Sequence, residues 1–284
     1  MRRAVVVLLA ATLLAAAAAP AVQAAPRRIV ALNPFAANTL ADLGIRPVAI
    51  GQVLGGHDRL SPKLRGVRMI PLSHPNGPNM EQLATLNPQL VLSSQAWRRG
   101  HRAMTRLGMR VAESEPRSVH AVGAETRRIG ALVGRKAAAD TLARRIESGV
   151  ARATRGIRRH PRVLVVLGVG RTPFAFLANS WGGDLVKRAG GRLLTEGLSA
   201  SGGFARISNE TVVKRNPDII IAVPHGSTKD IPKLARYLKS NPAWRTTRAA
   251  RRGQIYVSTG NSLLQPWTDV GRTITDVRSK FLKN

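Results

Sequence analysis

One stretch of the chain occurs twice, once in each half of the sequence. Residues 79–92 read Asn-Met-Glu-Gln-Leu-Ala-Thr-Leu-Asn-Pro-Gln-Leu-Val-Leu, and residues 208–221 read Ser-Asn-Glu-Thr-Val-Val-Lys-Arg-Asn-Pro-Asp-Ile-Ile-Ile. Each copy places a glutamate, Glu81 or Glu210, six residues before an Asn-Pro pair, and an apolar run follows that pair. Ordinary helix–proline–strand units explain the Asn-Pro pair and the apolar run, but not a glutamate at the same place in both. The repeat therefore predicts two related lobes with a pseudo-twofold relation.

Short apolar runs alternate with amphipathic stretches throughout the chain. In the first half we expect strands at 28–32, 47–53, 89–93 and 109–113, helices at 36–43, 80–86 and 99–107, and a Gly-, Pro- and His-rich loop at 55–78. In the second half we expect strands at 162–168, 218–223 and 254–258, and helices at 181–189, 209–214, 231–238 and 269–282. Strands and helices that alternate with short links are typical of α/β lobes with parallel sheets.

Two helical patterns, at 119–133 and 136–157, separate these halves. In the second pattern Leu142, Ile146 and Val150 form one apolar stripe at helical spacing. We therefore predict an α/β fold with two Rossmann-like lobes whose parallel sheets are joined by one long α-helix. The expected boundaries are an N-terminal lobe at 25–133, a connecting helix at 134–158 and a C-terminal lobe at 159–284.

The first residues are typical of an export signal. Two arginines follow Met1, residues 4–19 are an unbroken apolar run, and small residues precede Ala24. A membrane anchor is the alternative, but the run is shorter than the roughly 20 residues that span a bilayer. We expect cleavage of residues 1–24. The chain has no cysteine, which excludes disulfides and a cysteine-linked lipid anchor. We therefore expect a soluble protein, periplasmic or secreted.

Composition limits the function classes. The chain has 45 Lys and Arg against 15 Asp and Glu, a formal net charge of +30. Such a field attracts anions, although the arginines are scattered along the chain, as exchangeable surface residues would be. A secreted polyanion-binding protein is one alternative, but aromatic residues are only 4% of the chain, and nucleic-acid modules need aromatic platforms. An enzyme is another, but Gly168-Val-Gly170 lacks the third glycine of a dinucleotide site and no serine elbow occurs.

Several segments in order resemble the iron-complex and cobalamin family of periplasmic binding proteins. They are Ile-Val-Ala-Leu-Asn-Pro at 29–34, Gly-Asp-Leu-Val-Lys-Arg-Ala-Gly-Gly at 183–191, Asn-Pro-Ala-Trp at 241–244, and the two repeated glutamate segments. The resemblance implies a binding protein and not an enzyme, two lobes with a rigid connecting helix that closes only slightly, and delivery of a ligand to an ABC importer. It implies no cofactor of the protein's own, no nucleic-acid partner, and a monomer that meets the membrane only through the permease.

The resemblance also implies a role for the repeated glutamates. In that family a glutamate on each lobe docks on arginines of the permease dimer, and Glu81 and Glu210 match those positions. Carboxylate–guanidinium pairs are bidentate and orientation-specific, which suits such docking. The alternative is two solvated glutamates in first helical turns, where negative charge is mildly stabilising. Family members often carry Thr-Glu near the first helix; here Ala37-Asn38 stands there, which leaves the role of that helix open.

Ligands of α/β lobes collect at the carboxyl ends of the strands. Residues at or after predicted strand ends are therefore the ligand-binding candidates: Asn33, Phe35, Trp97, Arg98, Arg171, His225 and Trp267. The tryptophans, Trp181 included, suit stacking on a flat ligand, and the arginines suit pairing with carboxylates or catecholates. Packing inside the lobe is the alternative for Trp181.

Pro224-His225-Gly226 resembles the haem-binding branch of the family, in which a histidine at this point binds iron. His74 lies in the proline-rich loop before Glu81, so His74 and His225 together could hold haem iron axially. For each histidine the alternative is a loop residue with no ligand role. Haem is favoured as the transported ligand, with a ferric siderophore next and cobalamin third.

Overall fold

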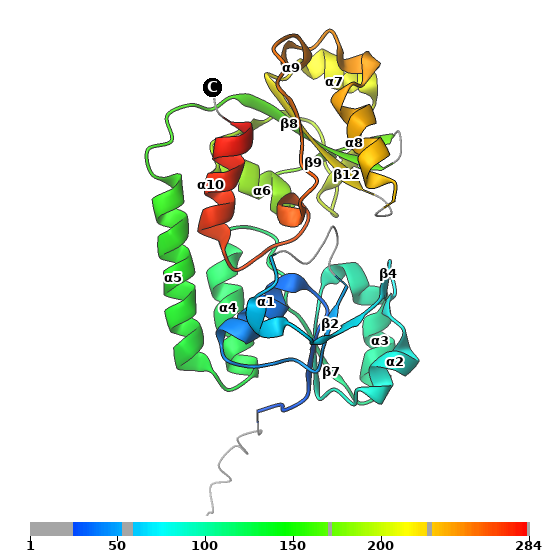
Figure 1. The fold of residues 1–284 in the computed structure, drawn as a ribbon, viewed down its shortest axis with the longest axis vertical. Coiled ribbons are helices and arrows are strands. Elements are labelled where there is room, and N and C mark those ends of the chain that lie inside the picture. The colour runs from blue at the N-terminus through cyan, green and yellow to red at the C-terminus, as the bar shows by residue number, and fades with distance from the viewer. Residues whose placement is uncertain (1–24, 53–58, 170–171, 226–228, 283–284) are drawn as a thin grey trace, which may run out of the picture.

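The computed structural model describes residues 25–52, 59–169, 172–225 and 229–282. The predicted signal at 1–24 lies outside the described residues. Two α/β lobes stack along the long axis of the molecule, and a long helix runs beside both (Figure 1). Within the described residues no helix has the length and hydropathy that a bilayer span requires.

The first lobe has a parallel sheet in the order β3-β2-β1-β6-β7. Its strands are β1 (Ile29–Ala31), β2 (Ala49–Gly51), β3 (Arg68–Ile70), β6 (Leu90–Ser93) and β7 (Arg110–Glu113). Central β1 pairs Val30 with Ala49 on one side and with Val91 on the other. All three residues are buried because helices cover both faces of the sheet. These helices are α1 (Pro34–Asp42), α2 (Met80–Thr85) and α3 (Arg98–Arg106).

The expected loop at 55–78 contains strands that the sequence pattern did not predict. β3 pairs with β2 at the edge of the sheet. β4 (Leu72–Ser73) and β5 (Gly77–Pro78) form a short antiparallel hairpin. These strands are only two or three residues long, and Arg68 is exposed, so they lack the apolar pattern by which a buried strand is recognised. The hairpin carries His74, one of the predicted metal-binding residues.

The second lobe has a mixed sheet in the order β11-β9-β8-β12-β13, with β10 also paired to β8. Its strands are β8 (Arg162–Val169), β9 (Thr172–Phe176), β10 (Arg192–Leu193), β11 (Phe204–Arg206), β12 (Ile219–His225) and β13 (Ile255–Val257). β9 runs antiparallel to β8 and to β11, whereas an all-parallel sheet was predicted. Only two residues join β8 to β9, and a link of that length makes a hairpin and not a crossover.

Helices cover both faces of this sheet as well. They are α6 (Trp181–Arg188), α7 (Asn209–Arg215), α8 (Ile231–Lys239), α9 (Arg248–Arg251) and α10 (Val270–Phe281). β12 pairs along its whole length with β8, from Ile219 opposite Val163 to His225 opposite Val169. The histidine therefore stands at the carboxyl end of a central buried strand.

The connecting helix is α5 (Lys136–Thr154), with α4 (Ala121–Leu132) packed on it from the first lobe and α10 from the second. Small residues allow these close contacts. A Cβ on Gly130 would lie 2.1 Å from the Cβ of Ala139, and one on Gly271 would lie 2.7 Å from backbone atoms of Gly149. Glycines that are poor helix formers therefore let the three helices approach closely.

The sequence repeat is a structural repeat. α2 is capped by Asn79 and α7 by Ser208. Each of these polar side chains accepts a hydrogen bond from a backbone N–H in the first turn of its helix. Asn87 and Asn216 follow these helices with φ of 43° and 44°. Each leads through a proline into a central strand, β6 or β12. Asparagine tolerates the left-handed conformation better than other side chains, which explains its presence in both copies.

Candidate functional site

The strand ends of the two lobes face each other across a cleft that contains two cavities. We call the first the aromatic cavity; its volume is about 500 Å³. From the first lobe and the segment after it, it is lined by His74, Gln95, Ala96, Glu113, Glu115, Pro116 and Arg117. From the second lobe it is lined by Asn179, Ser180, Trp181, Gly182, Ser201, Gly202, Phe204, Leu263, Leu264 and Pro266. One wall is therefore largely polar and the other largely aromatic and aliphatic.

The two predicted histidines come from opposite lobes. His74 is exposed between β4 and β5 and lies edge-on to the ring of Trp97, with ring centroids 6.0 Å apart. His225 is half-buried at the end of β12. Burial lowers the pKa of His225, and the positive charge of His74 lowers it further. The structure thus brings the imidazoles close enough for their charges to interact, and it favours neutral His225, the form that binds a metal.

Trp97 and Arg98 lie at the junction of a short 3₁₀ turn and α3, after β6. Trp97 packs over Gly77 of the hairpin that carries His74. Arg98 makes an ion pair with Glu113, with Nε 2.9 Å from Oε1. Arg98 therefore already has a carboxylate partner, and its ligand role stays a prediction.

Three other candidates are buried. Asn33 caps α1 and donates through Nδ2 to the carbonyl of Ser93 at 3.0 Å. Phe35 is fully buried, and Trp267 is 1% exposed beneath the guanidinium of Arg59. None of the three lines the aromatic cavity, and Trp267 lines the second cavity described below. Arg171 lies outside the described residues. Trp181, for which stacking and packing were both open, is 6% exposed, donates from Nε1 to the carbonyl of Ser262, and lines the aromatic cavity with its remaining surface.

Glu115 and Arg117 were not among the predicted site residues, although both directly follow the predicted strand at 109–113. Burial raises the pKa of Glu115 to about 7, opposed by a hydrogen bond with the side chain of Ser94. Arg117 donates to Gln95 Oε1 at 3.2 Å in the first lobe, and to the carbonyls of Asn179 at 3.4 Å and Ser201 at 3.0 Å in the second. The rule that marks strand ends could have found both residues.

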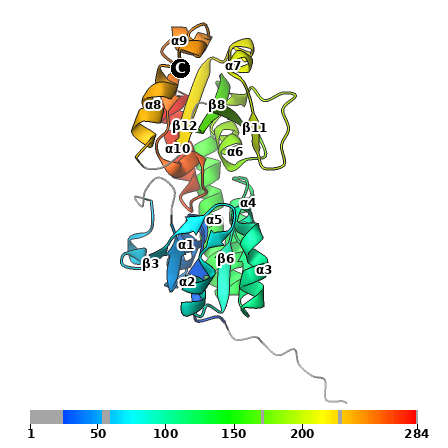
Figure 2. The same cartoon turned by 90° about the vertical axis from the view of Figure 1, so that its right-hand side faces the viewer.

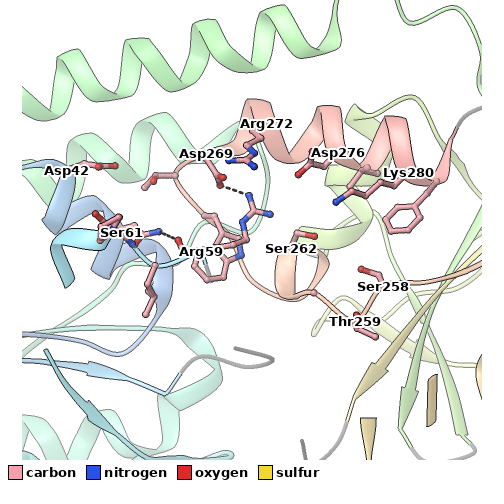
Figure 3. A pocket seen from close by; sticks show the side chains of 18 of the residues that line it. Asp42, Arg59, Ser61, Ser258, Thr259, Ser262, Asp269, Arg272, Asp276 and Lys280 are labelled. Carbon is pink, nitrogen blue, oxygen red and sulfur yellow. Dashed lines mark hydrogen bonds and ion pairs between the residues drawn. The ribbon is translucent and has the colours of Figure 1, made fainter. Parts of the chain in front are cut away.

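The second cavity, which we call the polar cavity, has a volume of about 720 Å³ and lies between α1 and α10 (Figure 3). Arg59 crosses from the first lobe to α10, where its Nη2 is 2.6 Å from both Asp269 Oδ1 and Thr273 Oγ1. Burial raises the pKa of Asp42, against a hydrogen bond with Thr268. Although it is the larger cavity, neither His74 nor His225 lines it.

The polar cavity also gives the first helix a role. Asn38 donates to the carbonyl of Arg59 and accepts a hydrogen bond from the backbone N–H of Ser61. Ala37 is buried. Ala37 and Asn38, which stand where family members often have Thr-Glu, thus help to position the segment around Arg59. That segment extends toward the second lobe.

Glu81 and Glu210 are both the second residue of their helices, α2 and α7, and both are exposed. Neither carboxylate has an ion-pair partner within the described residues. A hydrogen bond with the side chain of Ser208 lowers the pKa of Glu210 and keeps it charged. Both helices lie on the side of the molecule away from α5, one on each lobe (Figures 1 and 2). The helices that carry the two glutamates therefore lie on the same side of the molecule, one on each lobe.

A sequence model of a family described as periplasmic binding protein matches residues 29–261. The chain is a member of the periplasmic binding protein family. The family is one of binding proteins and not of enzymes, which confirms the expectation drawn from the resemblance.

Curated relatives of this periplasmic binding protein include a cobalamin-binding protein of Halobacterium salinarum, 28% identical over 253 residues, which are 86% of this chain and 66% of that protein. They also include the high-affinity heme uptake system protein IsdE of Staphylococcus aureus, 26% identical over 194 residues, which are 65% of this chain and 64% of that protein. The chain thus spans about two thirds of the length of either relative.

Solved structures confirm the fold. A substrate-binding protein of an ABC transporter from Listeria monocytogenes has a TM-score of 0.78 at 20% identity, with 90% of this chain and 99% of that chain covered. S. aureus IsdE complexed with heme has a TM-score of 0.76 at 24% identity, with the same coverage. At these identities the likeness establishes the two-lobed architecture alone.

Proposed function

We propose that this chain is the substrate-binding protein of an ABC importer and that it captures an iron porphyrin between its lobes. The observations that carry the proposal are that His74, from the first lobe, lines a cavity with an aromatic wall and that its charge lowers the pKa of His225, from the second lobe. Two imidazoles on opposite faces of a haem are a common axial set. The proposal agrees with the heme uptake of one relative, IsdE.

The cavity suits a flat, largely apolar ligand. Trp181, Phe204 and Leu263 line one wall, and a volume of about 500 Å³ falls within the range of small-molecule sites. The porphyrin is the transported substrate, and His225 would bind its iron from the buried side of the cleft because its imidazole is neutral at pH 7.

Delivery would use the glutamates. The helices that carry Glu81 and Glu210, α2 and α7, lie on one side of the molecule, one on each lobe, and this arrangement supports docking on a twofold-symmetric permease dimer. We infer that the chain works outside the cytoplasm, after removal of residues 1–24, and as a monomer that reaches the membrane through the permease.

The proposal is tested by titrating the mature protein with hemin and following absorbance. We expect a sharp Soret band in the wild type and a loss of affinity on the order of a hundredfold, about 2.7 kcal/mol, in His225→Ala. His120→Ala is the matched control, since His120 is an exposed histidine at the start of α4 that lines neither cavity. The absence of a Soret band in the wild type would reject the iron porphyrin.

Cobalamin is a second candidate, favoured by the relative from H. salinarum, which matches 86% of this chain. A ferric siderophore is a third. Quenching of tryptophan fluorescence by cyanocobalamin or by a ferric siderophore, with no response to hemin, would select between them. In a different class, a secreted polyanion-binding protein would bind DNA with a steep salt dependence and no cleft ligand.

A further inference from the structure

Arg117 is a positively charged residue in the cleft whose side chain donates hydrogen bonds to both lobes. It follows β7, lines the aromatic cavity and is exposed. Its guanidinium donates to Gln95 in the first lobe and to the carbonyls of Asn179 and Ser201 in the second. All three acceptors are neutral, so the positive charge of Arg117 is oriented by these bonds but not neutralised.

The carboxylates that line the same cavity are engaged elsewhere. Glu113 pairs with Arg98, with Nε and Nη2 on its two oxygens at 2.9 and 3.2 Å. Glu115 is hydrogen-bonded with Ser94. Arg117 therefore has no counter-ion among the described residues. A guanidinium has five N–H donors, and because Nη1 donates once and Nη2 twice, the Nε–H and one Nη1–H remain for a ligand. These two N–H groups are not parallel, so each can donate a single hydrogen bond.

The rest of the cavity has the opposite chemistry. Trp181, Phe204, Leu263, Leu264 and Pro266 form its apolar wall. An apolar surface that faces one oriented, unpaired cation suits a ligand with a flat apolar body and a negative group at its edge. A carboxylate suits the free donors of Arg117 because a hydrogen bond between two charged groups is about twice as strong as one between neutral groups.

We propose that Arg117 binds a carboxylate of the transported ligand and thereby selects carboxylate-bearing ligands over neutral analogues. The inference rests on the proposed function for the porphyrin body of the ligand and adds the group at its edge. Because the same guanidinium also holds carbonyls of the second lobe, a bound carboxylate joins a set of contacts that spans both lobes.

The test compares iron protoporphyrin IX with its dimethyl ester, in which both carboxylates are masked. Affinities are measured by absorbance titration, in the same detergent for both porphyrins, for the wild type, Arg117→Gln and Arg117→Lys. The control is Arg99→Gln, which removes an equal charge from an exposed position on α3 that does not line the cavity.

We expect the wild type to prefer the free acid by on the order of tenfold, as one charge-assisted hydrogen bond predicts. Arg117→Gln should weaken the free acid by that factor and leave the ester within about twofold. Arg117→Lys should keep part of the preference, and Arg99→Gln should keep all of it.

Equal binding of the two porphyrins by the wild type would overturn the inference, as would an Arg117→Gln variant that weakens both equally. These outcomes leave the proposed function standing, because the Soret band would still change on binding. A wild type that leaves the Soret band of both porphyrins unchanged from that of the porphyrin in detergent alone would reject the proposed function instead, and the role of Arg117 toward porphyrins with it.

Discussion

The two lobes share their outer elements and differ in their cleft walls. α2 and α7 have the same cap, the same exposed glutamate at the second position, and the same left-handed asparagine at the end. The sheets differ, however: the first is parallel and the second contains the antiparallel strands β9 and β11. The outer surfaces thus suit a symmetric partner, whereas the cleft suits an asymmetric ligand.

The difference between the sheets determines the chemistry of the cleft. β11 supplies Phe204 to the aromatic cavity, and the segment between α6 and β11 supplies Ser201 and Gly202. In the described part of the first lobe the five-stranded sheet is wholly parallel, and its side of the cavity consists largely of polar residues such as Gln95 and Glu113. The first lobe therefore supplies a largely polar wall, and the second supplies the apolar residues of the cavity.

The largest expected effect concerns the shared elements. Glu81→Ala and Glu210→Ala should each reduce ligand uptake into cells by on the order of tenfold or more, because each removes a carboxylate of a charge pair with the permease. Ligand binding by the purified variants should not change.

Gln82→Ala, an exposed neighbour on α2, is the control for uptake. If one glutamate proved essential and the other dispensable, the lobes would not be equivalent at the permease.

Glu115 should make stability depend on pH. Its pKa in the folded protein is about 7, above the ordinary 4.5, so the folded state binds the proton more tightly than the unfolded chain. The free energy of unfolding therefore falls as pH rises from about 4.5 to 7, by up to about 3 kcal/mol. Glu115→Gln should remove this penalty and raise Tm above pH 7 by several degrees, with little change near pH 4.5.

Thermal melts at pH 5 and pH 8 check this expectation. Glu196→Gln, on the surface of the second lobe, is the control because its side chain is 63% exposed. If the Tm difference between wild type and Glu115→Gln were the same at both pH values, the raised pKa of Glu115 would be contradicted.

The ion pair that Arg59 and Asp269 make between the lobes should contribute less to the free energy of unfolding than the effect expected for Glu115. The side chains of Arg59 and Asp269 are 23% and 43% exposed, so Arg59→Ala should reduce the free energy of unfolding by about 1 kcal/mol or less, and by less still at high salt. Arg128→Ala breaks a pair with Glu125 within one helix and is the intralobe control. Urea unfolding at low and high salt compares them. A much larger loss for Arg59→Ala would mean that the lobes depend on this contact for their arrangement.

The smallest effect is a pKa change across the cleft. The positive charge of His74 lowers the pKa of His225 below its ordinary 6.5, after the larger effect of burial. His74→Ala should therefore raise the pKa of His225, measured by proton NMR titration of the ligand-free protein. An unchanged titration midpoint would show that the histidines do not interact across the cleft.

Much of the fold could be predicted from the sequence because its central strands are continuous apolar runs. The strand expected at 89–93 is β6, and the one expected at 218–223 lies within β12. β3 and the β8–β9 hairpin were missed for physical reasons. An edge strand such as β3 carries exposed residues, and the direction of β9 follows from a two-residue link that the apolar pattern does not reveal.

The candidate site was predictable in position but not in detail. The rule that ligands collect at strand ends led to His225 at the end of β12 and to Trp97 after β6, but not to Glu115 and Arg117 after β7. It could not show that Phe35 and Trp267 are buried by neighbouring elements, nor that Arg117 would face the cavity without a counter-ion. Those properties depend on packing between segments that are far apart in the sequence.

The coordination of bound iron tests the central claim most directly. Electron paramagnetic resonance of the ferric haem complex distinguishes six-coordinate low-spin iron from five-coordinate high-spin iron. We predict a low-spin signal in the wild type that becomes high-spin in both His74→Ala and His225→Ala and stays low-spin in His120→Ala. A wild-type spectrum that neither substitution changes would contradict a haem held between the lobes by these two histidines.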